Sequence, residues 1–115
     1  MWFTGYNSYN LNSNLEPINV GIISNANGVS YNLYECYKIG KIFICNGYIK
    51  FEQAIDKNTN FLHFDLVTKG SRTYIPVINV DTIIYFMMDK NGYIKHELPK
   101  VDVGSYAISI VTVLE

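Results

Sequence analysis

The sequence has little charge and almost no arginine. Arg72 is the only arginine, charged residues make up 17% of the chain, and the formal net charge is -1. Nucleic-acid binding needs a basic footprint, and an anionic membrane attracts polybasic patches; both are missing. No apolar run approaches the roughly 18 residues that span a bilayer. These absences argue against nucleic acid and membrane as partners.

A secretory signal is also missing from the first ten residues, which have no basic segment followed by an apolar one. We therefore expect a protein made in the cytoplasm, or one released by lysis rather than by secretion.

Groups that could converge for catalysis are few. The histidines are His63 and His96, there is no glycine-rich phosphate loop, and no serine, histidine and aspartate spacing forms a triad. His63 and Asp65 fall on one face of an expected strand. A structural role for His63 is the main interpretation, and an ion held by His63 on the axis of a trimer is the alternative. We expect no enzyme activity, no cofactor and no metal within one chain.

What the chain does have is a β composition. It contains 10 tyrosines and 6 phenylalanines among 49% hydrophobic residues, and aromatic and β-branched side chains suit a half-buried pleated surface. The length of 115 residues allows one domain. We expect it over residues 20–115, after a lead-in or linker over residues 1–19 that either packs on a neighbouring chain or frays.

Alternating hydrophobic residues mark the expected strands. Within residues 48–55, 61–66 and 106–113, apolar side chains lie mainly at alternate positions. The last of these segments is apolar on both faces, so it should be central or covered. Residues 56–60 and 68–73 are expected to be exposed loops, and only residues 51–57 leave room for a helical turn.

Glycine-containing dipeptides predict the turns. Asn27-Gly28, Asn46-Gly47 and Asn91-Gly92 suit tight type I′ hairpins, and the last is the clearest case; the second also fits one long strand with a bulge. A type II′ turn at Gly40-Lys41 would place Cys36 opposite Cys45 in a pair where side chains lie closest. A disulfide is then geometrically possible, while free thiols are favoured in a reducing cytoplasm.

The order of these signals resembles the C-terminal receptor-binding domains of bacteriophage tail fibres. The resemblance lies in the strand pair YKIGKIFI at residues 37–44, in the segments at 47–49 and 66–76, in the Asn-Gly-x-Ile hairpin at 91–94 and in the closing strand at 104–109. The Leu-Pro that precedes this family's loop is absent here. Contractile-tail bacteriocins have similar tips.

This resemblance implies an antiparallel β-sandwich of jelly-roll type, assembled as a homotrimer at a virion tail tip, that attaches to a bacterial cell-surface saccharide and to other tail-fibre or baseplate proteins. Two alternatives stay open: a structural trimerisation or attachment module of a tail or baseplate, and a free-standing lectin or carbohydrate-binding module.

Sugar binding needs flat aromatic faces together with amide, guanidinium or carboxylate groups. The expected turns and loops supply them as candidate ligand-binding residues, although each of these side chains could equally pack in a core or shape a turn: Tyr6, Tyr9, Asn58, Asn60, Arg72 and Tyr74.

The amount of apolar surface also favours self-association. A domain of this size buries a limited fraction of its surface, yet residues 83–88 and 106–114 are apolar on both faces. The excess apolar surface favours an interface between like chains. The threefold symmetry comes from the resemblance alone.

Overall fold

A computed structural model describes residues 16–80 and 82–115 of the chain. Within them the fold is all-β and contains no helix, as the composition predicts, and residues 51–57 form bends and a short strand instead of a helical turn. The strands are β1 (Ile18–Asn19), β2 (Ile22–Asn25), β3 (Val29–Ile39), β4 (Ile42–Phe51), β5 (Ile55–Asp56), β6 (Leu62–Phe64), β7 (Arg72–Asn79), β8 (Thr82–Asp89), β9 (Tyr93–His96), β10 (Lys100–Val101) and β11 (Gly104–Val113).

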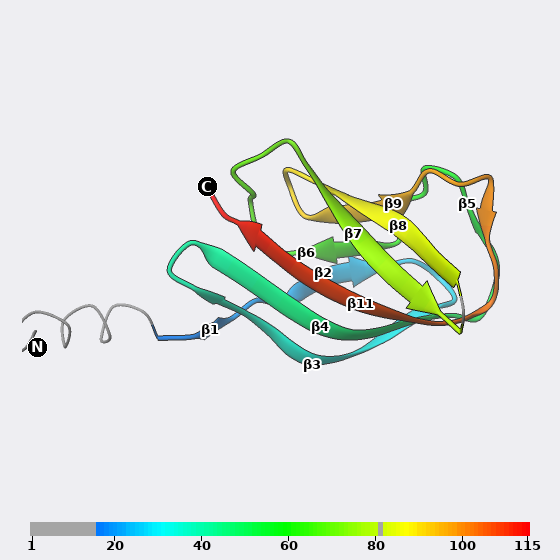
Figure 1. Ribbon diagram of the computed structural model, residues 1–115, viewed down its shortest axis with the longest axis horizontal. Helices are drawn as coiled ribbons and strands as arrows, with labels where there is room; N and C mark the ends of the chain where they lie inside the picture. Colours follow the sequence, from blue (N-terminus) through cyan, green and yellow to red (C-terminus); the bar gives the residue numbers. More distant parts are fainter. Residues whose placement is uncertain (1–15, 81) are drawn as a thin grey trace, which may run out of the picture.

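Nine of these strands form one antiparallel sheet in the order β1-β3-β4-β11-β7-β8-β9-β6-β2, while β5 and β10 pair separately. The sheet curls into a half-barrel (Figure 1). The expected antiparallel all-β class is confirmed. Strand β11 lies between β4 and β7, which confirms the central position predicted from its two apolar faces.

The curl is held by one short segment that bonds to both ends of the sheet. β1 pairs with β3 and β2 pairs with β6. Between them, the amide of Val20 donates to the carbonyl of Cys36 at 3.0 Å, and the carbonyl of Gly21 accepts from the amide of Asp65 at 2.9 Å. Two adjacent residues therefore contact opposite ends of the sheet.

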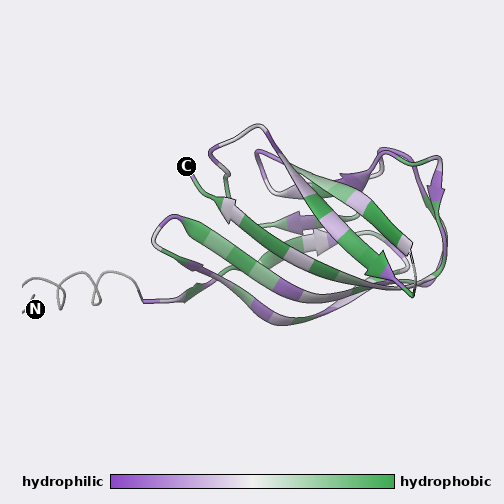
Figure 2. Cartoon of the chain, in the orientation of Figure 1, coloured by the Kyte–Doolittle hydropathy of each residue, from purple (hydrophilic) through white to green (hydrophobic). Residues whose placement is uncertain are grey.

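The inner face of the curl forms a single hydrophobic core. Phe43 on β4 and Phe64 on β6 meet edge to face, and Phe51 does the same with Phe61. Burial alternates along β4, although Figure 2 shows that the first half of this strand is hydrophobic throughout. The alternation predicted for residues 48–55 and 106–110 is confirmed, since their alternate apolar side chains are buried, namely Ile49, Phe51, Ile55, Tyr106, Ile108 and Ile110.

The turn predicted at Gly40-Lys41 is confirmed. Ile39 pairs with Ile42 around it, and Gly40 has a φ of 57°, which is the left-handed region that the first central position of a type II′ turn requires. The register places Cys36 opposite Cys45, as the sequence predicts.

The hairpin predicted at Asn91-Gly92 exists between β8 and β9, but the predicted turn type is wrong. Gly92 has a positive φ of 88° and Asn91 does not, whereas a type I′ turn needs both. The Asp89 carboxylate accepts from the amides of Asn91 and Tyr93 at 2.9 and 3.1 Å. This side-chain bonding holds a longer loop over residues 90–92.

The other two Asn-Gly pairs do not form hairpin turns. Gly28, with a φ of 77°, lies between β2 and β3, which do not pair with each other, so Asn27-Gly28 makes a corner. Asn46-Gly47 lies within β4, opposite an irregularity in β3 between Leu33 and Glu35. The alternative of one long strand with a bulge is therefore correct, and the bulge belongs to the partner strand.

One residue of the expected exposed loop at 68–73 is buried. Thr68 is fully buried: its hydroxyl donates to the carbonyl of Gly70 at 2.6 Å, and its amide donates to the carbonyl of Lys90. Lys69, Gly70 and Ser71 are exposed. A threonine that satisfies its own hydroxyl locally can be buried at little cost, which polarity alone does not reveal.

Within the residues that the structure describes, there is no helix of the length and apolarity needed to cross a membrane.

Candidate ligand groove

An incompletely covered strand edge positions the candidate site. On one side β8 pairs with β7 along its whole length, but on the other side β9 pairs only with residues 86–88 of β8. The chain then leaves the sheet after His96 and passes through Glu97 and Leu98 toward β10. The first half of β8 is thus bordered by this connection, and two hollows lie beside it.

The first hollow, here called the aromatic groove, has a volume of about 290 Å³ and is lined by Tyr74, Ile83, Ile84, Tyr85, Met87, Glu97 and Leu98. Tyr74 and Tyr85 are 55% and 59% exposed. They reach the outer face because alternate residues of β7 and β8 point outward: Tyr74 pairs with Met87, and Tyr85 pairs with Pro76. The groove therefore offers two aromatic faces and one carboxylate to a ligand.

Arg72 lies two residues before Tyr74 on β7, so the two side chains are on the same face of the strand. Its pKa is raised by a hydrogen bond to the Tyr74 side chain, and then by attraction from Tyr74 and from Glu97. The groove therefore contains a phenol and a carboxylate, and a cation lies beside Tyr74 on the same strand.

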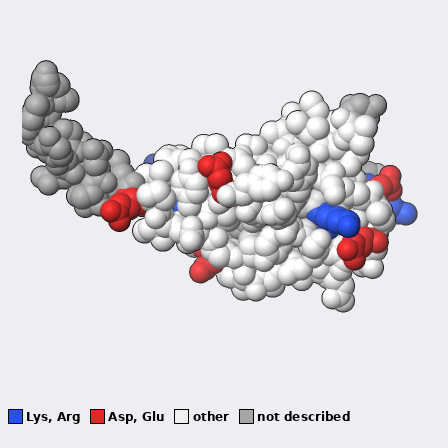
Figure 3. Space-filling model, turned by 90° about the horizontal axis from the view of Figure 1, so that it is seen from below, with Lys and Arg blue, Asp and Glu red and all other residues white. Residues whose placement is uncertain are grey.

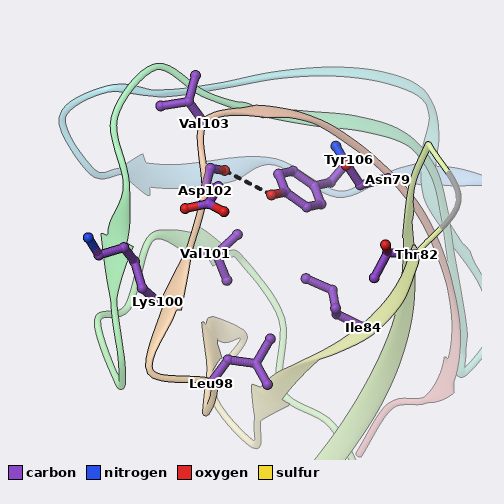
Figure 4. A pocket seen from close by; sticks show the side chains of 9 residues that line it. All are labelled: Asn79, Thr82, Ile84, Leu98, Lys100, Val101, Asp102, Val103 and Tyr106. Carbon is purple, nitrogen blue, oxygen red and sulfur yellow. Dashed lines mark hydrogen bonds between the residues drawn. The ribbon is translucent and has the colours of Figure 1, made fainter.

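The second hollow, here called the polar hollow, has a volume of about 390 Å³ (Figure 4). Its side chains come from the end of β7, from β8, from β10 and its flanks, and from the start of β11; they are Asn79, Thr82, Ile84, Leu98, Lys100, Val101, Asp102, Val103 and Tyr106. The Tyr106 hydroxyl donates to the carbonyl of Asp102 at 2.8 Å, which fixes the ring along the wall. Burial, and then the charge of Asp102, raise the pKa of Tyr106.

The two hollows share Ile84 and Leu98. They therefore adjoin beside the first half of β8, the first with exposed aromatic rings and the second with more polar side chains. Together the two hollows present aromatic rings and hydrogen-bonding groups, which suit an uncharged, hydroxyl-rich ligand.

The structure brings together two of the predicted ligand-binding residues. Arg72 and Tyr74 lie on the same face of β7, and Tyr74 lines the groove. Asn58 and Asn60 lie in the exposed β5–β6 connection and line neither hollow. Asn58 has a φ of 64° and its amide donates to the carbonyl of His96, so it shapes a turn. Tyr6 and Tyr9 lie outside the described residues.

Sequence reasoning missed Tyr85, Glu97 and the whole polar hollow. The signal for Tyr85 was available, since Ile83, Tyr85 and Met87 alternate with residues of the core face and an outward tyrosine on a strand is a candidate contact. Nothing local identifies Glu97, because its position depends on where β9 ends.

His63 makes ordinary structural contacts in the single chain. Its ring stacks on Tyr93 with centroids 3.6 Å apart, and its Nε2 donates to the carbonyl of Asn91 at 3.0 Å. Across residues 16–80 and 82–115, no three histidine, cysteine, aspartate or glutamate side chains are grouped to hold a metal ion.

The outer surface also carries an exposed apolar patch at the β4–β11 seam, here called the seam patch. It consists of Ile42, Ile44, Val111 and Val113, which pair in register as Val113 with Ile42 and Val111 with Ile44. Val111 is 68% exposed. Figure 3 shows one side of the molecule on which charged side chains are few and scattered.

Comparison with protein-family models, with curated proteins and with solved structures gives no match for this chain.

Proposed function

We propose that this chain is a receptor-binding domain of the phage tail-fibre type, which attaches to a bacterial cell-surface saccharide through the aromatic groove and the adjoining polar hollow. The observation that carries the proposal is the pair of exposed rings, Tyr74 and Tyr85, beside Glu97 and Arg72. The resemblance in residues 37–44, 91–94 and 104–109 supplies the biological setting.

The chemistry of the groove favours a sugar over a charged ligand. A pyranose ring presents C–H groups on one face and hydroxyl groups around its rim. Tyr74 and Tyr85 can pack against the C–H face, while Glu97 and Arg72 can hydrogen-bond to the hydroxyl groups. The acidic and basic groups also balance each other, so the groove does not select a net charge.

We propose further that three copies associate, in the jelly-roll sandwich arrangement of that family. The seam patch supports self-association, because it is apolar, partly exposed and separate from the residues that line the hollows. The halves of the curled sheet enclose a common core, which is compatible with a two-layer arrangement. Three weak sugar sites on one surface would gain avidity.

Binding of the fluorescently labelled protein to intact bacteria, with purified cell-wall and capsular saccharides as soluble competitors, tests the adhesin function. We expect labelling of a susceptible strain that a saccharide abolishes. Tyr85→Ala should reduce the affinity for that saccharide about tenfold or more, because a buried aromatic contact contributes about 1.4 kcal/mol or more. Glu97→Gln should weaken it through loss of a charged acceptor.

Tyr31→Ala is the matched control. Tyr31 is also an exposed tyrosine on a strand, 42% exposed on β3, but it lines neither hollow. Its loss should leave binding unchanged. Equal losses in Tyr85→Ala and Tyr31→Ala would contradict the groove as the site, and absence of labelling on every related strain would contradict the adhesin function.

The structural alternative, a trimerisation module of a tail or baseplate, is favoured by the seam patch alone. A trimer in solution that labels no strain would support it. A monomer that binds a saccharide would instead support a carbohydrate-binding module. Sedimentation of the wild type distinguishes a trimer from a monomer. Sedimentation of Val111→Lys tests whether the seam patch forms the trimer interface, because a lysine there should dissociate such a trimer.

A further inference from the structure

We propose that Cys36 and Cys45 form a thiol–disulfide pair that closes reversibly when a small-molecule disulfide oxidises the folded protein. Both are free thiols in this structure. The inference rests on the β3–β4 hairpin and is independent of the proposed function.

The register of the hairpin provides the geometry. The pair Ile39 and Ile42 closes a two-residue turn, and such a pair exchanges hydrogen bonds. Hydrogen-bonded and non-hydrogen-bonded pairs alternate along an antiparallel ladder. The pair of Cys36 and Cys45 is three pairs farther from the turn, so it is a non-hydrogen-bonded pair. An independent contact agrees: the carbonyl of Cys36 accepts from the amide of Val20, on the side away from β4.

Non-bonded antiparallel pairs bring Cα atoms to about 4.5 Å, which lies within the separation that a disulfide spans. The two side chains also share a face, since directly opposed residues do. The hairpin can therefore accept the S–S bond without a change of register.

The two thiols differ in the way that a stepwise exchange requires. Cys36 is half-buried, whereas Cys45 is fully buried. The hydrogen bond from Cys45 lowers the pKa of Cys36, against an opposing effect of burial. The same contact, together with burial, raises the pKa of Cys45. Cys36 is thus the accessible and more acidic thiol, and Cys45 is the protonated partner behind it.

The exchange takes place in two steps. The Cys36 thiolate attacks one sulfur of an external disulfide RSSR, which forms a mixed disulfide and releases one RS⁻. The Cys45 sulfur then loses its proton and attacks the Cys36 sulfur, which forms the Cys36–Cys45 bond and releases the second RS⁻. Two thiols of the protein become one disulfide, RSSR is reduced to two RSH, and no further oxidant is needed.

Closure changes the contacts of β3. The Cys36 thiol donates to the carbonyl of Val20 at 3.3 Å, and this donor is lost in the disulfide, while the backbone bond between the same two residues persists. The covalent bond closes a short loop around the turn and should raise the melting temperature by roughly 10 °C.

The test is incubation of the full chain with oxidised glutathione, followed by intact mass measurement, peptide mapping and thermal unfolding. We expect the loss of two hydrogens, a cross-linked Cys36–Cys45 peptide, the rise in melting temperature, and full reversal by a dithiol reductant. Cys45→Ser should stop at the glutathione adduct on Cys36, and Cys36→Ser should react slowly, because Cys45 is buried.

Three outcomes would overturn the proposal: a wild-type protein that retains the glutathione adduct, one that cross-links between chains, or one in which both thiols stay alkylatable after oxidation. The wild-type measurements decide the matter even where a variant fails to fold.

Discussion

Phe43 on β4 and Phe64 on β6 meet edge to face, with ring centroids 5.4 Å apart and planes at 64°. Their strands are not neighbours in the sheet, since β11, β7, β8 and β9 lie between them in strand order. The contact therefore crosses the interior of the curl and connects its two halves.

We expect Phe43→Ala and Phe64→Ala each to lower the free energy of unfolding by about 3–5 kcal/mol, because both rings are fully buried and leave a cavity. Urea denaturation measures this. The double variant should show a coupling of roughly 0.5–1.5 kcal/mol. Ile23→Ala, at a 57% exposed position on β2, should change stability by less than about 0.5 kcal/mol. Additive effects of the two phenylalanine substitutions would contradict the contact.

Gly47 permits the close approach of β4 to the bulge in β3. A Cβ atom there would lie 2.3 Å from the carbonyl oxygen of Asn32 and 2.7 Å from the Cα of Leu33, both backbone atoms that cannot rotate away. Gly47→Ala should therefore destabilise the fold by about 1–3 kcal/mol or more. Gly21→Ala is the control, since nothing lies within 4 Å of its added carbon. Equal melting temperatures for the two variants would show that the bulge relaxes.

Tyr106 should make stability fall at alkaline pH. Burial raises its pKa above the usual value of 10.0, so the folded state retains a proton that the unfolded state releases. Its contribution is fully present below pH 10 and is lost as the pH rises through the folded-state pKa. Tyr106→Phe should cost about 0.5–1.5 kcal/mol at neutral pH, through loss of the bond to Asp102.

The measurement is urea denaturation of the wild type and of Tyr106→Phe between pH 7 and pH 11. The two stabilities should converge above pH 10, because only the wild type carries this ionisation. A difference in unfolding free energy between the two proteins that stays constant across that pH range would show that Tyr106 does not cause the alkaline loss of stability.

His96 connects the end of β9 to the small β5–β10 sheet. It is fully buried, and its Nε2 donates to the carbonyl of Ile55 at 2.6 Å, while its Nδ1 has no hydrogen-bond partner. His96→Phe should cost about 1–3 kcal/mol, because it leaves the Ile55 carbonyl unpaired. It should also speed hydrogen exchange at Val101, which pairs with Ile55.

His63→Phe is the comparison for His96→Phe. The His63 ring is only partly buried and stacks on Tyr93, so phenylalanine preserves most of the contact and the cost should stay below about 1 kcal/mol. A larger loss of unfolding free energy for His63→Phe than for His96→Phe would contradict the structural role of the buried His96.

The strands could be predicted because their signal is local. In β4, residues such as Ile49 and Phe51 alternate with Tyr48 and Lys50, and this pattern follows from the pleat alone. The register of Cys36 and Cys45 followed from one turn, because a two-residue loop fixes the pairs beyond it as far as the bulge in β3.

The order of the strands and the groove could not be predicted in this way. The pairing of Gly21 with Asp65 depends on how far the sheet curls, which no short segment specifies. Tyr85 and Glu97 meet at the groove because β9 ends at His96, and the turn at Gly92 was misjudged because the Asp89 side chain supplies bonds that the dipeptide itself does not.

The central position of β11 has a consequence for biosynthesis. Of the strands described here it leaves the ribosome last, yet it pairs with β4 along its whole length and also contacts β7. Until it is released, both of those strands present unpaired edges, which invite association with other nascent chains. A chain truncated before residue 104 should accordingly accumulate as aggregates rather than as a smaller folded domain.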